Sequence, residues 1–122
     1  MNLVKWMSAE DLDPPHGLDM SSPHDYKKVE MLEKKFREEG FDKKYPALIG
    51  YPLNGKVQLL SGTHRHAAAT RSGAKLPIVM WLRSDIEASW GELEKWRKVI
   101  EDIPVSVLET WTREDLERNR LT

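Results

Sequence analysis

Five consecutive residues, Ser61-Gly62-Thr63-His64-Arg65, combine the kinds of side chain that proteins use to bind phosphate. Hydroxyls, an imidazole and a guanidinium all donate hydrogen bonds, and the guanidinium fork matches two phosphate oxygens at once. Gly62 has no side chain, so an anion can approach the backbone there. The residue pattern leaves a second interpretation open, in which Ser61 or Thr63 only caps a helix and Arg65 is solvated.

The elements on either side must position this segment. Residues 56–60 are typical of a strand, and residues 63–72 are typical of an alanine-rich helix that Gly73 ends. A strand that turns directly into a helix brings unpaired backbone N–H groups and the positive end of the helix dipole to one point. The sequence therefore predicts an anion site at the start of this helix.

Two further patterns predict the sheet that carries the segment. Asn54-Gly55 is typical of a tight hairpin turn, and it separates strand-like residues 46–53 from residues 56–60. Residues 77–82 are continuously apolar, which indicates a strand buried on both faces near the middle of a sheet.

A long helix is predicted before the hairpin. Ser22, Pro23 and Asp25 form a typical helix start, with a cap, a proline at the first position and an acid in the first turn. We expect this helix to run to residue 39, with Gly40 as a left-handed C-terminal cap. Its apolar stripe consists of Tyr26, Val29, Leu32 and Phe36.

The two ends of the chain are predicted to add shorter elements. Residues 3–7 favour a strand, followed by a helical turn from Ser8 and a loop across residues 13–17. Further helices are expected from Ser84 to the residue before Pro104 and from about Thr112 to Arg120. The tryptophans interpreted as core residues are Trp81, Trp90 and Trp96.

From residue 21 to about residue 83, the order of these elements resembles the ParB/sulfiredoxin superfamily. The resemblance is carried by residues 56–69, which read KVQLLSGTHRHAAA, followed by Gly73 and Leu76-Pro77-Ile78-Val79. These residues are similar to the family's strand, its Gly-x-x-Arg helix start and its following Ile-Pro-Val-type strand.

We therefore predict one α+β domain over residues 1–122, with a ParB/sulfiredoxin-like fold and a small mixed sheet flanked by helices. A chain of 122 residues suffices for one compact core. The resemblance places that core at about residues 21–83 and leaves residues 84–122 as a helical extension.

The resemblance implies a nucleoside triphosphate, ATP or CTP, with or without Mg²⁺, whose phosphates lie at the helix start. In sulfiredoxin the matching stretch is Gly-Gly-Cys-His-Arg, and its His and Arg contact ATP phosphates, so His64 and Arg65 take that role here. Lys28 matches the nucleotide-binding lysine of the sulfiredoxin Ala-Lys-Val sequence. Met31 and Lys35 share its helix face, whereas sulfiredoxin has hydroxyl residues there. The predicted nucleotide-binding residues are Lys28, Ser61, Gly62, Thr63, His64 and Arg65.

Departures from the family separate the candidate functions. Thr63 stands where sulfiredoxin has its cysteine, and the chain has no cysteine, so sulfinic-acid reduction is excluded. Free-serine kinases carry an acid at the position of Ser61, so a kinase-like phosphotransferase acting on a small-molecule or DNA hydroxyl is an alternative that ranks below binding. A DNA-binding or nuclease protein is a third alternative. It ranks last, because only Gly62 and Arg65 of the ParB Gly-Glu-Arg-Arg box remain and no helix-turn-helix region of usual length follows.

Charge and composition bear on partners and location. The formal net charge of −1 disfavours DNA held through phosphate contacts, although the lysine-rich residues 27–44 form a local basic stretch. Lys27 and Lys34 are interpreted as solvated. The absence of cysteine, of a signal sequence and of a membrane-spanning run predicts a cytoplasmic protein. No metal site is predicted, because His64 and His66 point to different faces of a helix.

One expectation follows for the glycine of the motif. Gly62→Val is expected to abolish ligand binding and to leave most of the fold intact, with a smaller effect on stability than Val79→Ala. This expectation holds provided that Gly62 does not have a positive φ angle.

Overall fold

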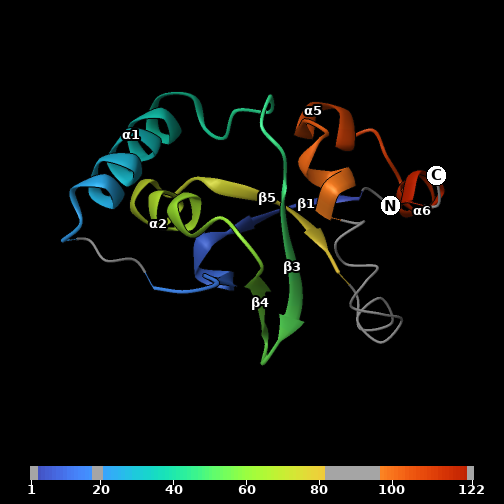
Figure 1. Cartoon of the computed structure of the whole chain (residues 1–122), viewed down its shortest axis with the longest axis horizontal. Helices are drawn as coiled ribbons and strands as arrows, with labels where there is room; N and C mark the ends of the chain where they lie inside the picture. The colour runs from blue at the N-terminus through green and yellow to red at the C-terminus, as the bar shows by residue number, and fades with distance from the viewer. Residues whose placement is uncertain (1–2, 18–20, 82–96, 121–122) are drawn as a thin grey trace.

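The computed structural model describes residues 3–17, 21–81 and 97–120 (Figure 1). Its strands are β1 (Val4–Ser8), β2 (Leu12–Asp13), β3 (Leu48–Leu53), β4 (Lys56–Leu59) and β5 (Lys75–Met80). Its helices are α1 (Pro23–Glu39), α2 (Thr63–Ser72), α5 (Val105–Leu108) and α6 (Arg113–Arg120), with a 3₁₀ turn, η1 (Ala9–Asp11), and a helical stretch over residues 97–101.

The strands form one mixed sheet in the order β1-β5-β3-β4-β2. The pairs β1·β5 and β3·β4 are antiparallel, and the pairs β3·β5 and β2·β4 are parallel. The β3–β4 hairpin turns at Asn54 and Gly55, whose φ angles are 52° and 81°. Two consecutive positive φ angles are what a tight hairpin turn requires, so the predicted hairpin and the predicted mixed sheet are confirmed.

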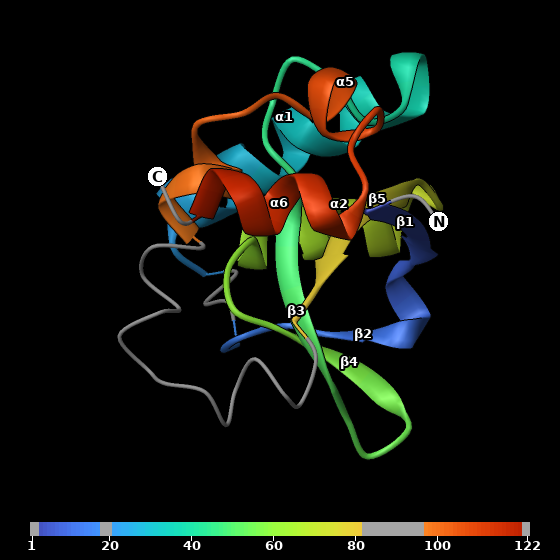
Figure 2. The ribbon, with the colours of Figure 1, turned by 90° about the vertical axis from the view of Figure 1, so that its right-hand side faces the viewer.

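Apolar side chains alternate across the central strands and fill a core on each face of the sheet. Leu48 and Ile78 pack toward α1 and α2, whereas Ile49 and Val79 pack toward Ile100 and the C-terminal helices. In Figure 1, α1 and α2 accordingly lie on one side of the sheet and α5 and α6 on the other. Figure 2 shows α6 lying across β3 on that second side. The predicted strand buried on both faces is therefore confirmed in β5, although it begins at Lys75.

The first long helix has the predicted bounds but not all of the predicted packing. Val29 and Phe36 of the stripe are buried, whereas Tyr26 is 46% exposed, so its assignment to the apolar stripe was wrong. Tyr26 lies in the first turn of α1. Gly40 has a φ of 73° but a ψ of −163°, so it is not the left-handed cap that was predicted, whereas Gly73, with a φ of 77° and a ψ of 7°, is one.

The ends of the chain differ from the prediction in detail. The first strand begins and ends one residue later than expected, and the predicted loop from residue 13 overlaps β2, whose Leu12 pairs with Val57 and is buried. Helix α5 was not predicted. It follows Pro104 directly, and its Val105 and Leu108 are buried. Trp81 is buried as expected.

Two sequence-based expectations are not covered by the structure. Most of the helix predicted from Ser84, together with Trp90 and Trp96, lies outside the described residues. The division into a core and a C-terminal extension stays a prediction. Within the described parts of the chain, no helix is long and apolar enough to cross a membrane.

Helix α6 begins next to Thr112, as the sequence predicted, and its start has a reciprocal cap. The backbone N–H of Thr112 donates to Asp115 Oδ2 at 2.8 Å, and the backbone N–H of Asp115 donates to Thr112 Oγ1 at 3.3 Å. These contacts hold the pKa of Asp115 below its ordinary value; the Thr112 backbone N–H contributes most, and Arg118 adds to it. The carboxylate form of Asp115 is therefore the form that stabilises the helix start.

We predict that Asp115→Asn lowers the free energy of unfolding at neutral pH and has little effect in strong acid. The folded pKa lies below the unfolded value of about 3.9, so the charged group stabilises the fold above that value. This contribution is lost as the pH falls through the lowered folded pKa. Chemical denaturation of both proteins at several pH values measures it, and a destabilisation that does not change with pH would contradict the assignment.

Candidate functional site

A groove with a volume of about 780 Å³ lies between α1 and the junction of β4 with α2. Its walls include all six predicted nucleotide-binding residues, Lys28 and the five residues of Ser61–Arg65. Met31 and Lys35 also line it, from the helix face that the sequence assigned to them. The tertiary structure thus brings together residues separated by more than thirty positions in the chain, along one continuous hollow.

The start of α2 opens into this groove without a side-chain cap. Gly62 is the N-cap residue, and within the described residues no side chain hydrogen-bonds to the free N–H groups of the first turn. Thr63 is buried, and Ser61 is half-buried. The structure therefore contradicts the interpretation that Ser61 or Thr63 merely caps the helix. The first-turn N–H groups and the positive end of the helix dipole remain available to an anion.

Arg65 is a half-buried cation that forms no ion pair within the described part of the chain. Its Nη1 donates to the carbonyl oxygen of Pro46 at 3.2 Å. Among the residues that the structure describes, no carboxylate forms an ion pair with its guanidinium. Burial lowers the pKa of Arg65, and the charge of Glu101 partly opposes that effect. Because removing a charge from water is costly, an unpaired guanidinium at the wall of a groove favours an anionic ligand.

His64 is held by a carboxylate that the sequence analysis did not assign to the site. Its Nε2 lies 2.8 Å from Asp25 Oδ1, and both side chains are about a quarter exposed. Asp25 was interpreted only as a first-turn acid of α1, because its proximity to His64 depends on how α1 packs against α2. The contact occupies Nε2, so Nδ1 is the ring nitrogen left for a ligand.

His66 has a structural role on another side of α2. Its Nε2 lies 3.1 Å from the carbonyl oxygen of Ala9 and 3.0 Å from that of Leu12. Two carbonyl acceptors require a protonated Nε2, so this ring ties α2 to η1 and β2. His64 and His66 are thus held by different elements. In the described residues, no group of three or more His, Asp or Glu side chains is placed to bind a metal.

The lysines of α1 divide into two sets. Lys28 and Lys35 line the groove, whereas Lys27 and Lys34 do not, although all four are exposed. Within the described chain, neither Lys28 nor Lys35 forms an ion pair. Their charges therefore add to that of Arg65 along the same groove.

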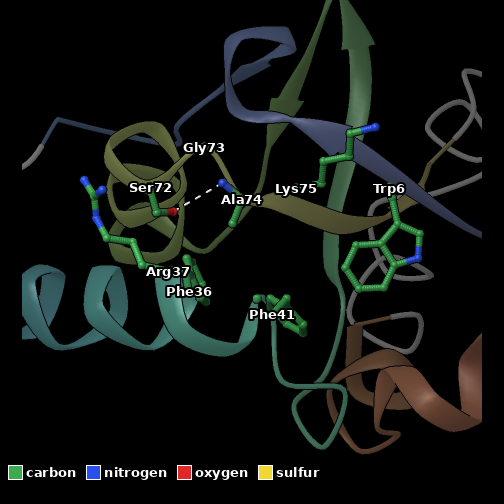
Figure 3. A pocket seen from close by; sticks show the side chains of 9 residues that line it. Trp6, Phe36, Arg37, Phe41, Ser72, Gly73, Ala74 and Lys75 are labelled. Carbon is green, nitrogen blue, oxygen red and sulfur yellow. Dashed lines mark hydrogen bonds between the residues drawn. The ribbon is translucent and has the colours of Figure 1, made fainter.

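A second hollow, of about 600 Å³, lies where α1, α2 and β1 meet (Figure 3). Trp6, Phe36 and Phe41 contribute aromatic walls, and Arg37 lies at one side. Arg37 already donates to the carbonyl oxygen of Arg71 at 2.8 Å. The hollow lies at the C-terminal ends of α1 and α2, where the helix dipole is negative, so it is less suited to an anion than the groove.

The geometry at Gly62 corrects the expectation for Gly62→Val. Gly62 has a φ of 90° and a ψ of 32°, so the condition attached to that expectation fails. A Cβ atom at this position would also overlap Leu48 Cδ2 in the core. The glycine is therefore required by the fold itself, and its replacement does not separate binding from folding.

The chain is similar in fold to a ParB and to a sulfiredoxin. The first is the C-terminally truncated chromosome-partitioning protein ParB from Caulobacter crescentus, complexed with CTP-gamma-S, with 23% identity and a TM-score of 0.49. The match covers 68% of this chain and 46% of that chain, so this chain spans about half the length of that ParB. The second is sulfiredoxin from Arabidopsis thaliana, with 18% identity, a TM-score of 0.48, and 70% and 93% of the two chains covered.

No protein-family model and no curated protein sequence matches this chain. The two similar structures bear the family names that the sequence resemblance predicted, and the predicted α+β fold with a small mixed sheet is confirmed. At these identities and TM-scores, the similarity concerns the fold alone and carries no argument about a ligand.

We predict that Gly62→Val destabilises the protein at least as much as Val79→Ala. A left-handed backbone angle costs a residue with a Cβ about 1–2 kcal/mol. Overpacking against Leu48 adds about 1–3 kcal/mol. Urea denaturation of both variants measures the two losses, and a Gly62→Val protein of near wild-type stability would contradict the prediction.

A double variant separates the effect of the overlap with Leu48 on stability from the effect of the backbone angle. Gly62→Ala should be less harmful in a Leu48→Ala background than in the wild type, because the smaller side chain leaves room for the new Cβ. Strictly additive losses would show that the backbone angle, and not the contact with Leu48, makes glycine necessary.

Proposed function

We propose that this protein binds a nucleoside triphosphate, ATP or CTP, with its phosphates at the start of α2. The observation that carries the proposal is the position of Arg65. This half-buried guanidinium, which has no ion pair among the described residues, lines the same groove as the uncapped helix start. A phosphate there would accept hydrogen bonds from the first-turn N–H groups and from the guanidinium.

The charges along the groove support a ligand with several negative charges. Lys28, Lys35 and Arg65 all line it, and the described carboxylates do not pair with them. A triphosphate would bring several negative charges to this positively charged wall. The volume of about 780 Å³ is in the range of small-molecule and cofactor sites, which run from about 300 to 1,000 Å³. A magnesium ion would enter bound to the phosphates, as is usual for this cation.

We predict that Arg65→Ala lowers the affinity for the triphosphate tenfold or more. The loss of a charge-assisted hydrogen bond is worth about 1.5–3 kcal/mol, which corresponds to that factor or more. Calorimetric titration with ATP and with CTP measures the change. Arg65→Lys, which keeps the charge but not the fork, should fall between the two proteins.

The lysine pairs of α1 supply the control for this experiment. Lys28→Ala and Lys35→Ala should weaken binding, whereas Lys27→Ala and Lys34→Ala remove the same charge from the same helix outside the groove. Equal effects of all four substitutions would point to a general charge effect. If neither triphosphate binds the wild type, or if Arg65→Ala binds as the wild type does, the site assignment fails.

One observation favours a second candidate function, phosphoryl transfer from the bound triphosphate to a hydroxyl. With Asp25 as the acceptor, the neutral imidazole of His64 carries its proton on Nε2 and keeps a lone pair on Nδ1. A histidine oriented in this way by a carboxylate is a typical general base. Binding ranks above turnover because Ser61 stands where the kinase branch has its acid.

If the protein is a phosphotransferase, His64→Gln should bind the triphosphate but lose at least a hundredfold in turnover. General-base catalysis contributes about 10²–10⁴-fold to rates. The assay follows magnesium-dependent product formation with a panel of hydroxyl acceptors, including free serine and hydroxymethylated DNA. Binding without turnover on any acceptor leaves a binding protein, and turnover unaffected by His64→Gln removes His64 as the base.

A further inference from the structure

Apolar side chains form much of the lining of the groove. Met31 and Tyr45, which are 65% and 53% exposed, both line the groove. The other apolar side chains that line it are Pro15, Leu32, Phe36, Phe41, Pro46 and Leu60. Large apolar side chains that face a concave surface favour a flat, apolar ring as their partner, because stacking removes them from water.

Two carboxylates also line the groove, from the last turn of α1 and the loop that follows it. They belong to Glu39 and Asp42. Asp42 Oδ1 accepts the backbone N–H of Lys44 at 2.9 Å, which leaves Oδ2 as an acceptor. Within the described residues, Glu39 forms no ion pair, even with Lys35 one turn earlier.

These carboxylates set the direction in which a triphosphate can lie. Lys28 and Glu39 are eleven residues apart on α1, which is about 16 Å along the helix axis. Phosphates are attracted toward Lys28 and the start of α2, and they are repelled by Glu39 and Asp42. The base of the nucleotide is therefore directed toward the carboxylates and toward Tyr45, in the loop that follows α1.

We propose that Glu39 and Asp42 select a base that carries an exocyclic amino group, namely adenine or cytosine over hypoxanthine or uracil. This inference rests on the proposed function. An amino group donates to a carboxylate, whereas the keto oxygen that replaces it in the other two bases is itself an acceptor. A keto base would leave the carboxylates unpaired and place acceptor against acceptor, which is the kind of mismatch that discriminates strongly.

The test compares triphosphates that differ by one group. Calorimetric titrations use CTP against UTP and ATP against ITP, with the wild type and the double variant Glu39→Gln/Asp42→Asn. Glu38→Gln is the matched control, because Glu38 is exposed on the same turn of α1 but does not line the groove. We expect the wild type and the Glu38→Gln variant to prefer the amino base at least tenfold in one or both pairs.

In the double variant, this preference should fall to near unity. All four triphosphates can then bind somewhat more tightly, since two negative charges are gone, so the ratio of the two affinities within each pair is the quantity that decides.

Equal affinities within both pairs for the wild type, or a preference that survives in the double variant, overturns the inference while the triphosphate site stands. A double variant that loses affinity for all four triphosphates only when magnesium is present assigns the carboxylates to the metal and also overturns it. Failure of every triphosphate to bind the wild type overturns the proposed function and this inference together.

Discussion

The close approach of Gly62 to Leu48 is the constraint on which the site depends. Leu48 is fully buried at the start of the central strand β3, and Gly62 lies against its side chain with a left-handed backbone. Only a residue without a Cβ fits there without strain or overlap. This contact lets the chain turn from β4 into α2 directly over the sheet, so that the first turn of α2 faces the groove. The glycine that looks like a phosphate-binding residue in the sequence is therefore also a packing residue of the core.

Contacts from two sides hold the start of α2 in place. His64 is joined to Asp25 of α1, and His66 is joined to the carbonyl oxygens of η1 and β2. Two histidines that are two positions apart on one helix thus bind different elements. Because both rings are engaged by the protein, the first turn of α2 is positioned before any ligand binds, which reduces the ordering cost of binding.

The groove is lined by positive and by negative side chains at different places along its length. Lys28 lies in the N-terminal half of α1, on the opposite wall from the start of α2, and Glu39 and Asp42 lie at the other end of α1 and beyond it. Arg65, from the first turn of α2, is anchored by the carbonyl oxygen of Pro46 and has no ion pair among the described residues. A ligand with an anionic tail and a ring that donates hydrogen bonds matches this distribution better than a ligand of uniform charge. A half-buried guanidinium with no ion pair in the described part of the chain is not explained by the stability of the fold alone.

Local sequence determined most of the elements around the groove. Asn54-Gly55 requires positive φ angles, Ser22-Pro23 begins a helix that Glu39 ends, and Gly73 ends the next helix, because each of these features depends on residues close together in the chain. The resemblance to the ParB/sulfiredoxin superfamily joined Lys28 to the Ser61–Arg65 segment in one candidate site, and the structure places all of them along one groove, although their role in binding stays a prediction.

Tertiary structure alone decided the rest. The pairing of Asp25 with His64, the anchoring of His66 and the burial of Arg65 depend on how α1, α2 and the first strands pack, and these contacts join residues nineteen to fifty-seven positions apart. A side chain at position 62 would overlap Leu48, on strand β3, so the motif did not reveal that the glycine is indispensable to the fold. Tyr45 and Asp42 carry no periodic signal, because they lie in a loop whose path is set by the elements that it connects. Sequence patterns report what the chain does locally, and the chemistry of this groove arises where distant parts of the chain meet.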